Sequence, residues 1–454
     1  MRADILIAEI GSTTTVVNAL RGIAGGSPAF AGQGSAPTSV LAGDVRVGLK
    51  GAIADLERRL GETVEWGEMF ASSSAAGGLR MTVHGLAYDM TVRAAREAAL
   101  GAGAVLKFVT AGDMTDSDLE RVRRIQPNII LLAGGVDYGE RATVVGNARR
   151  LAALGLACPV IYAGNVAVRD EVEDILRDAG CQVIAVDNVY PRIDVLNVEP
   201  TRRAIQRAFE QHIVHAPGMD RVRDLVTGTI IPTPGAVMNM ARVLKEDIGD
   251  LVVVDVGGAT TDVHSVTEGS DEINRMLVSP EPVAKRTVEG DLGVYVNAAN
   301  VYELLDPTEL AGEFSDPEAL LRDIKPIPTT PDEIRFAERL TETATFTAVS
   351  RHAGTVQHLY GPSGRTTIAR GKDLSRVKWI IGTGGALTRL PNGAAILGRL
   401  RDNRRGREMW PSPEAEVLLD HDYIMASLGT LASRYPEAAL SLIKQSLRLV
   451  PRET

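Results

Sequence analysis

An acidic residue followed by a glycine turn and hydroxyl side chains marks the stretch of residues 251–266. Residues 251–254 are apolar and mostly β-branched, which is typical of a strand buried on both faces, and Asp255 follows them. A turn at Gly257 and Gly258 lets successive N–H groups point at an anion. Asp255 can neutralise a polyphosphate through a divalent metal, and Asp262 begins the returning strand near the same place. The expected nucleotide contacts here are Gly257, Gly258, Ala259, Thr260 and Thr261.

A similar arrangement lies near the N-terminus, at residues 5–17. An apolar strand reaches Glu9, a glycine turn follows, and a second apolar strand returns. One such hairpin is more often an ordinary β-turn than a ligand site. Two of them indicate related half-domains that face one nucleotide. The expected contacts of this copy are Gly11, Ser12, Thr13 and Thr14.

A third glycine loop occurs at residues 379–391, where a predicted strand runs into a predicted helix. A helix N-terminus suits a nucleoside or its phosphates. Two further predicted helices, residues 234–242 and 426–432, carry small residues that would let helices cross closely. The expected contacts of the third loop are Gly382, Thr383, Gly384 and Gly385.

These five elements, in this order, resemble the phosphate-1, connect-1, phosphate-2, adenosine and connect-2 motifs of the actin, sugar kinase and heat-shock-70 ATPase superfamily. The resemblance implies an α/β, two-lobed actin-like ATPase fold with duplicated ribonuclease H-like lobes and Mg-ATP between them. It places Glu9 and Asp255 near Mg²⁺ and Asp262 near the attacking water. The implied catalytic set is Asp262, Asp255 and Thr260.

Two positions depart from the superfamily pattern. Glu9 stands where phosphate-1 usually carries Asp, and it is one methylene longer. Residues 230–234 of the connect-1 segment contain no acid to orient water. The sequence therefore predicts ATP binding more firmly than rapid hydrolysis.

Composition excludes several other classes of protein. The chain has 454 residues, of which 44% are hydrophobic and 24% charged, as is usual for globular proteins. Its net charge of −9 argues against non-specific nucleic-acid binding. No long apolar run occurs, so we expect neither secretion nor a membrane span. Cys158 and Cys181 lack metal or redox spacing, and reduced thiols in the cytoplasm are expected.

Residues 74–215 alternate predicted strands with predicted helices, which indicates a doubly wound α/β domain inserted into the first lobe. Its glycine turns could border a ligand crevice, although plain turns are the favoured interpretation. The expected division is residues 1–73 for the start of the first lobe, 74–215 for the insertion, 216–250 for the return with the connect-1 helix, and 251–454 for the second lobe. The predicted strands are 104–110, 128–133, 159–163 and 182–186, and the predicted helices are 91–100, 117–125, 141–154 and 169–179.

Several segments receive less specific interpretations. Residues 22–34 are predicted as a loop or hairpin tip, and residues 334–359 as one long helix whose Arg351, His352 and His358 face solvent. His212 and His215 favour a surface role over metal binding, because no third ligand lies nearby in the sequence. Residues 399–410 form a basic run that is predicted to be a solvated loop.

The chain resembles the glutamate mutase accessory family often called MutL or GlmL. The motifs that carry this resemblance are residues 8–19, 255–264 and 380–391, and the resemblance covers nearly the whole chain. That resemblance implies a reactivating chaperone for an adenosylcobalamin-dependent mutase. His264 is expected to be a packed strand residue and not a cobalt ligand, because Thr267 stands where a cobalamin motif requires Gly. Two other classes stay open: an ATP-dependent small-molecule enzyme, either a kinase or a hydantoinase/oxoprolinase-like hydrolase, and a filament protein. The sequence leaves the oligomeric state undetermined.

Overall fold

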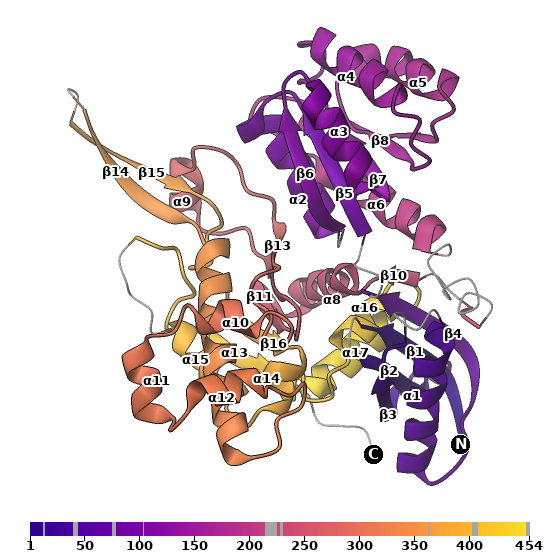
Figure 1. Cartoon of the computed structure of the whole chain (residues 1–454), viewed down its shortest axis with the longest axis vertical. Coiled ribbons are helices and arrows are strands. Elements are labelled where there is room, and N and C mark those ends of the chain that lie inside the picture. Colours follow the sequence, from indigo (N-terminus) through magenta and orange to yellow (C-terminus); the bar gives the residue numbers. More distant parts are fainter. Residues whose placement is uncertain are drawn as a thin grey trace. The chain divides into compact units, whose positions relative to one another are not determined.

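The computed structural model divides the chain into two compact units (Figure 1). Unit 1 contains Met1–Ala19 and Gly32–Ala236, and unit 2 contains Leu20–Ala31 and Val237–Thr454. The structure describes residues 1–11, 14–39, 44–74, 79–102, 104–213, 225–227, 230–361, 364–401 and 407–450. The predicted contacts Ser12 and Thr13, and also His215, lie outside these residues.

The first sheet of unit 1 begins with the strand that carries Glu9. Its strand order is β10-β4-β1-β2-β3, and both β1 and β10 run parallel to β4. Helix α1 (Val45–Leu60) lies between β3 and β4 in the chain; the Asp44 side chain caps its start, and it ends at Gly61. The strands are β1 Arg2–Ile10, β2 Thr14–Arg21, β3 Ala29–Pro37, β4 Glu65–Ser73 and β10 Ile230–Pro232.

The sheet of unit 2 repeats this topology. Its order is β13-β12-β11-β16-β17, with β11 and β17 parallel to β16, so β11 corresponds to β1 and β16 to β4. This repetition confirms the duplicated ribonuclease H-like lobes of the actin-like ATPase fold. The strands are β11 Leu251–Val256, β12 Thr261–Val266, β13 Ala284–Glu289, β16 Trp379–Thr383 and β17 Glu416–Leu419.

Helices follow the fifth strand of each sheet at corresponding places. Helix α8 (Thr233–Ile248) follows β10, and α16 (Met425–Leu431) and α17 (Pro436–Ser446) follow β17. On one face of the second sheet, alternate side chains of β11 pack in a core with the long helix α13 (Pro331–His352). Period-two alternation thus leaves the opposite face of β11 for Asp255.

The segment between β4 and β10 forms a separate parallel sheet in the order β6-β5-β7-β8-β9. This order confirms the inserted doubly wound α/β domain. Its first strand, β5, was not predicted. The strands are β5 Leu79–Gly85, β6 Ala104–Ala111, β7 Ile129–Leu132, β8 Val160–Tyr162 and β9 Val183–Ala185; the helices are α2 Arg93–Gly101, α3 Asp116–Ile125, α4 Ala142–Ala152, α5 Arg169–Asp178 and α6 Val198–Ile213.

Two element predictions were wrong in part. Residues 22–28 form the predicted turn between β2 and β3, but residues 29–34 belong to strand β3. Helix α13 ends at His352, and the chain then forms a hairpin of β14 (Thr355–Gly361) and β15 (Gly364–Arg370). Among the described helices, none combines the length and apolar character that a bilayer span requires. The remaining helices of unit 2 are α9 Asp271–Met276, α10 Ala298–Tyr302, α11 Pro307–Glu313, α12 Pro317–Arg322, α14 Gly385–Arg389 and α15 Gly393–Gly398.

Candidate functional site

The loops after β1 and β11 are closed by equivalent backbone hydrogen bonds. The Gly257 N–H donates to the Thr260 carbonyl at 2.9 Å, and the Gly11 N–H donates to the Thr14 carbonyl at 3.0 Å. Glu9 and Asp255 each precede the last residue of their strand. The duplication therefore extends to the residues that begin and close these two loops.

The carbonyl groups of the β11 loop are held by the segment of residues 294–297. The N–H of Val294 donates to the Gly257 carbonyl at 3.2 Å. The N–H groups of Tyr295 and Val296 both donate to the Gly258 carbonyl, at 3.0 and 2.7 Å. The Asn297 amide Nδ2 donates to the Ala259 carbonyl at 2.8 Å. Each of these three carbonyl groups is thus occupied by a donor from residues 294–297.

The N–H groups of the same loop are available. Within the described part of the chain, those of Gly258, Ala259 and Thr260 donate to no backbone or side-chain acceptor. Successive free N–H groups in a tight turn attract an anion. The loop therefore presents hydrogen-bond donors on one side while its acceptors are occupied on the other.

Polar side chains cross the sheet in a row beside this loop. Asp255 lies directly opposite Asp262 on β12 and beside Thr383 on β16. Directly paired residues point to the same face of a sheet. Thr383 continues the row through its hydroxyl, which donates to Asp420 at 3.0 Å. Three of the four side chains in this row are carboxyl groups.

Asp262 is held by a buried arginine. The Arg286 Nε and Nη2 atoms both donate to Asp262 Oδ1, at 3.0 and 2.6 Å. The Thr260 hydroxyl lies 3.2 Å from the other carboxyl oxygen of Asp262, Oδ2. Arg286 is only 1% exposed, so its charge is compensated inside the protein and not by water. Asp262, which was predicted to lie near the attacking water, thus has one oxygen in an ion pair and the other beside the Thr260 hydroxyl.

Asp255 has a different environment from Asp262. Burial of its carboxyl and the nearby Asp262 carboxylate raise the pKa of Asp255 to about 7, which Arg286 only partly offsets. Gly384 lies against it with φ of +84°, and a β-carbon there would come within 2.5 Å of Asp255 Oδ1. Only glycine fits at this position without moving the carboxyl group.

Asp420 is a site residue that the sequence analysis missed. It follows β17, is completely buried, and accepts hydrogen bonds from the N–H groups of Ile424 and Met425 at 3.2 and 2.8 Å. The Ser446 hydroxyl donates to it at 2.6 Å. Burial raises the pKa of Asp420, while these hydrogen bonds oppose the shift. Asp420 therefore joins the Thr383 loop to the start of α16. An acid directly after a strand was its only sequence signal.

Magnesium would need ligands beyond the protein. Among the described residues, no group of three or more His, Cys, Asp or Glu side chains is arranged to hold a metal ion. The carboxylate of Asp255 beside an anion-binding loop fits a metal held jointly by phosphate oxygens and water. Glu9, at the equivalent position of β1, is 7% exposed.

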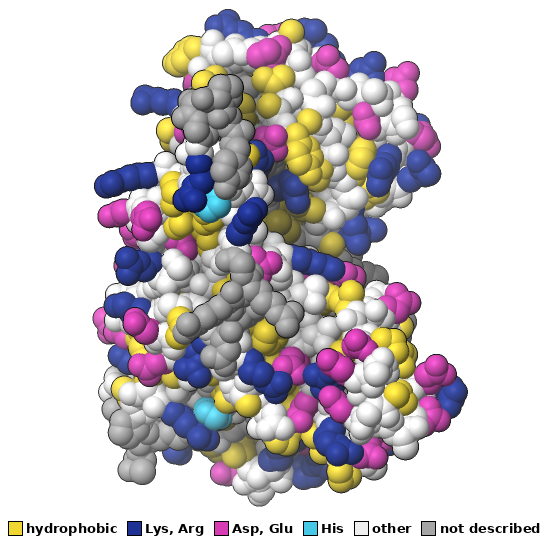
Figure 2. All heavy atoms as spheres, turned by 90° about the vertical axis from the view of Figure 1, so that its left-hand side faces the viewer, with side chains coloured by type: hydrophobic (Ala, Val, Ile, Leu, Met, Phe, Trp, Pro, Cys, Tyr) yellow, Lys and Arg dark blue, Asp and Glu magenta, His cyan; other side chains and the backbone are white. Residues whose placement is uncertain are grey.

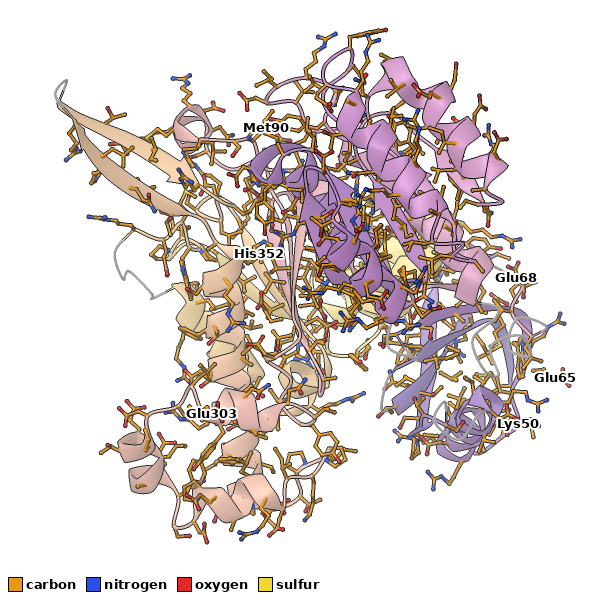
Figure 3. All side chains as sticks on the ribbon, turned by 45° about the horizontal axis from the view of Figure 1, so that its top comes forward. Lys50, Glu65, Glu68, Met90, Glu303 and His352 are labelled. Atoms are coloured by element: carbon orange, nitrogen blue, oxygen red, sulfur yellow. The ribbon has the colours of Figure 1, made fainter. Side chains whose placement is uncertain are left out.

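The histidines of unit 2 differ from expectation in one case. His352, labelled in Figure 3, is buried and not solvent-facing, which corrects the prediction. Its Nδ1 lies 2.9 Å from the Thr287 hydroxyl and its Nε2 lies 2.8 Å from the Ser265 hydroxyl. His264 is fully buried in β12, as expected for a packed strand residue. Arg351 pairs with Glu289 and Asp291 beside β13.

Known proteins resemble this chain at two levels. A curated protein named Protein MutL, from Clostridium tetanomorphum, is 39% identical over 426 residues, which cover 90% of this chain and 92% of that protein. Among solved structures, nucleotide-free acetone carboxylase has a TM-score of 0.39 at 13% identity, covering 95% of this chain and 70% of the other. Diol dehydratase-reactivating factor in nucleotide-free form has a TM-score of 0.35 at 11% identity, covering 96% of this chain and 100% of the other.

The two levels of similarity differ in weight. TM-scores this low carry no argument about the site. The family profile described as MutL protein, by contrast, matches residues 5–447. With this match and the extensive identity to a curated relative, the chain belongs to the MutL protein family.

Proposed function

We propose that the chain binds Mg-ATP through the loops after β1 and β11 and acts as a reactivating chaperone for an adenosylcobalamin-dependent mutase. The observation that carries the nucleotide part is the set of free N–H groups at Gly258, Ala259 and Thr260, whose carbonyl neighbours are held by residues 294–297. An arrangement of donors without acceptors favours a polyphosphate over a neutral or cationic ligand.

In this proposal each site residue has a defined task. The loop N–H groups bind phosphate oxygens, and Asp255 in its carboxylate form holds Mg²⁺ directly or through water, which supplies charge neutralisation to the phosphates. Asp262 keeps Oδ2 directed to Thr260, since Arg286 fixes its other oxygen. Gly382, Thr383, Gly384 and Gly385 serve the nucleoside, and Glu9 and Gly11 serve the phosphates.

The chaperone part rests on family membership and on the two-unit construction. A radical mutase that has lost its adenosyl group traps damaged cobalamin in a closed site. A chaperone can bind the mutase with different affinities in its different nucleotide-bound states. Such a chaperone can shift the mutase toward an open form that releases the damaged cofactor. Nucleotide turnover or exchange resets the cycle. The Glu9 substitution and the absent connect-1 acid predict that this turnover is slow unless the partner is bound.

The test measures phosphate and cobalamin release with the purified chain, Mg-ATP and a mutase from the same source that has been inactivated with cyanocobalamin. We expect the inactive mutase to stimulate ATP turnover and the chain to release cobalamin only when nucleotide is present. Asp255→Asn should abolish both effects, because the amide cannot supply the metal's negative charge.

Two other results would contradict the proposal. ATP turnover that responds to an amino acid or a cyclic amide but not to the mutase would identify a small-molecule enzyme. Failure of the chain to bind Mg-ATP at all would refute the site itself.

A further inference from the structure

A cavity lies at the end of the second sheet opposite the phosphate loop. It has a volume of about 920 Å³, and its lining includes Asp250 just before β11 and Lys378 just before β16. These strands are parallel, so the cavity adjoins their amino ends while the loop follows their carboxyl ends. The six residues of β11 separate the two places by about 20 Å. The cavity is thus distinct from the candidate nucleotide site.

The same cavity is continuous with the hairpin arm formed by β14 and β15. Helix α9 lines the cavity and lies beside β15 (Figure 1). Directly after α9, Leu277 pairs with Ala369 of β15, and the Val278 N–H donates to the Ala369 carbonyl at 2.9 Å. Beyond this base the arm projects from unit 2. Cavity, helix and arm therefore form one extended surface.

This surface carries an excess of unpaired positive charge. Within the described residues, its exposed basic side chains form neither an ion pair nor a side-chain hydrogen bond. Neighbouring cations behave otherwise: Lys245 pairs with Glu268 and Lys285 pairs with Glu281. The unpaired cations are Arg275, Arg376 and Lys378 at the cavity, Arg365 and Arg370 on β15, and Arg407, whose carbonyl accepts from the Val356 N–H of β14.

Acidic side chains on this surface are fewer, and one of them, Glu408 beside Arg407, accepts a hydrogen bond from the Ser350 hydroxyl. Asp271 and Glu272, in the first turn of α9, also line the cavity, and Asp250 there accepts from the Thr267 hydroxyl at 2.7 Å. Figure 2 faces the side of Figure 1 that carries the arm, and dark blue Lys and Arg side chains lie there among magenta acidic ones. In a chain of net charge −9, a local excess of free cations is unexpected for a merely solvated face.

We propose that this surface, which we call the basic arm surface, docks an acidic segment of a protein partner. Unpaired cations attract carboxylates and steer their approach. The three acids at the cavity, Asp250, Asp271 and Glu272, disfavour a uniformly charged nucleic-acid backbone but suit a protein segment of mixed charge. The exposed edges of the projecting hairpin can add an extended strand by main-chain hydrogen bonds. The inference rests on the proposed function for its partner, which is the mutase.

The test compares two double variants of the full chain. Arg376→Ser/Lys378→Ser removes cavity cations, and Arg322→Ser/Arg448→Ser removes two exposed, unpaired cations that lie outside the basic arm surface. Each is titrated with the inactivated mutase and, separately, with a fluorescent oligoglutamate peptide at low and high salt. We expect the first pair to weaken both interactions about tenfold or more and to reduce their salt dependence, while the control pair changes neither.

The outcomes separate this inference from the proposed function. Equal binding of mutase by both double variants would overturn the basic arm surface while leaving the chaperone role intact. If the original chain binds no mutase at any salt, but the first pair of substitutions abolishes peptide binding, the acidic-segment preference is supported and the chaperone role is refuted. Displacement of the peptide by inorganic phosphate at equal concentration would identify a small-anion site and overturn the docking proposal. Unchanged thermal unfolding of both variants controls for folding.

Discussion

At the scale of single residues, the paired carboxyl groups on β11 and β12 differ in how their charge is compensated. Asp262 has Arg286 as a close counter-charge, whereas no arginine of the described chain pairs with Asp255, whose pKa is raised. Both sit opposite each other on one face of the sheet. The Asp255 carboxyl group therefore becomes mostly charged only above about pH 7 or when a cation binds.

The raised pKa of Asp255 predicts a pH-dependent stability. Its folded-state pKa of about 7 exceeds the ordinary value of 3.8, so the folded protein retains a proton that the unfolded chain loses. Stability should fall as pH rises from about 4 to about 7 and level off above that. Thermal unfolding of the nucleotide-free protein measures this.

The matched variant for this prediction is Asp255→Asn, which cannot titrate. Subtracting its profile from that of the original protein isolates the contribution of Asp255, and an identical pH profile for both would contradict the assignment. Mg²⁺ needs the charged form, so Mg-ATP affinity of the original protein should rise about tenfold from pH 6 to pH 8.

The Arg286–Asp262 pair predicts strong non-additivity. Arg286→Met leaves the buried Asp262 carboxylate without its partner and should cost about 3–5 kcal/mol in the free energy of unfolding. Arg286→Met combined with Asp262→Leu removes both charges and should recover most of this loss. Urea unfolding of the two single variants and the double variant measures the coupling. Additive losses would show that the pair does not act as a unit.

At the scale of elements, the segment of residues 290–297 shapes the phosphate loop. A β-carbon at Gly293 would come within 2.3 Å of the Ala259 backbone carbon, whereas one at Gly290 would meet nothing within 4 Å. We expect Gly293→Ala to displace the loop and weaken Mg-ATP binding about tenfold or more, and Gly290→Ala to change it little. Titration calorimetry checks this. Equal affinities would mean that the loop does not depend on this segment.

The sequence predicted those elements whose signal is local. The strands before Glu9 and Asp255 and most of the inserted domain follow from apolar runs and glycine turns. Strand β5 was missed because its polar residues find partners inside the fold: His84 contacts the Thr82 hydroxyl of the same strand at 3.0 Å and the Thr110 hydroxyl of β6 at 2.8 Å. Burial lowers the pKa of His84 to about 4.

Side-chain partners distant in sequence could not be predicted. Arg286 lies 24 positions after Asp262, and Asn297 lies 38 positions after Ala259. Neither residue type at those positions has a periodic or motif signal of its own. His352 was misplaced for the same reason, since hydroxyl groups on β12 and β13 hold its ring inside unit 2.

At the scale of the whole molecule, the duplicated loops predict a stoichiometry. If both loops serve one nucleotide, calorimetry should give one Mg-ATP per chain. Gly11→Ala brings a β-carbon within 2.6 Å of the Thr14 carbonyl oxygen and should lower that single affinity. Two independent sites would instead give two nucleotides per chain, and the variant would leave the second site at full strength.

Residues 294–297 hold the carbonyl groups of the β11 loop, so substitutions outside the loop can change this site. The donors at Gly258, Ala259 and Thr260 are main-chain N–H groups, which do not depend on the side chains at these positions. Substitutions therefore affect these donors through the residues that hold the loop from behind. Gly293 and Asn297 are therefore positions where one base change in the gene could abolish the proposed nucleotide binding while every recognisable motif stays intact. Screening variants by motif alone would classify such alleles as harmless.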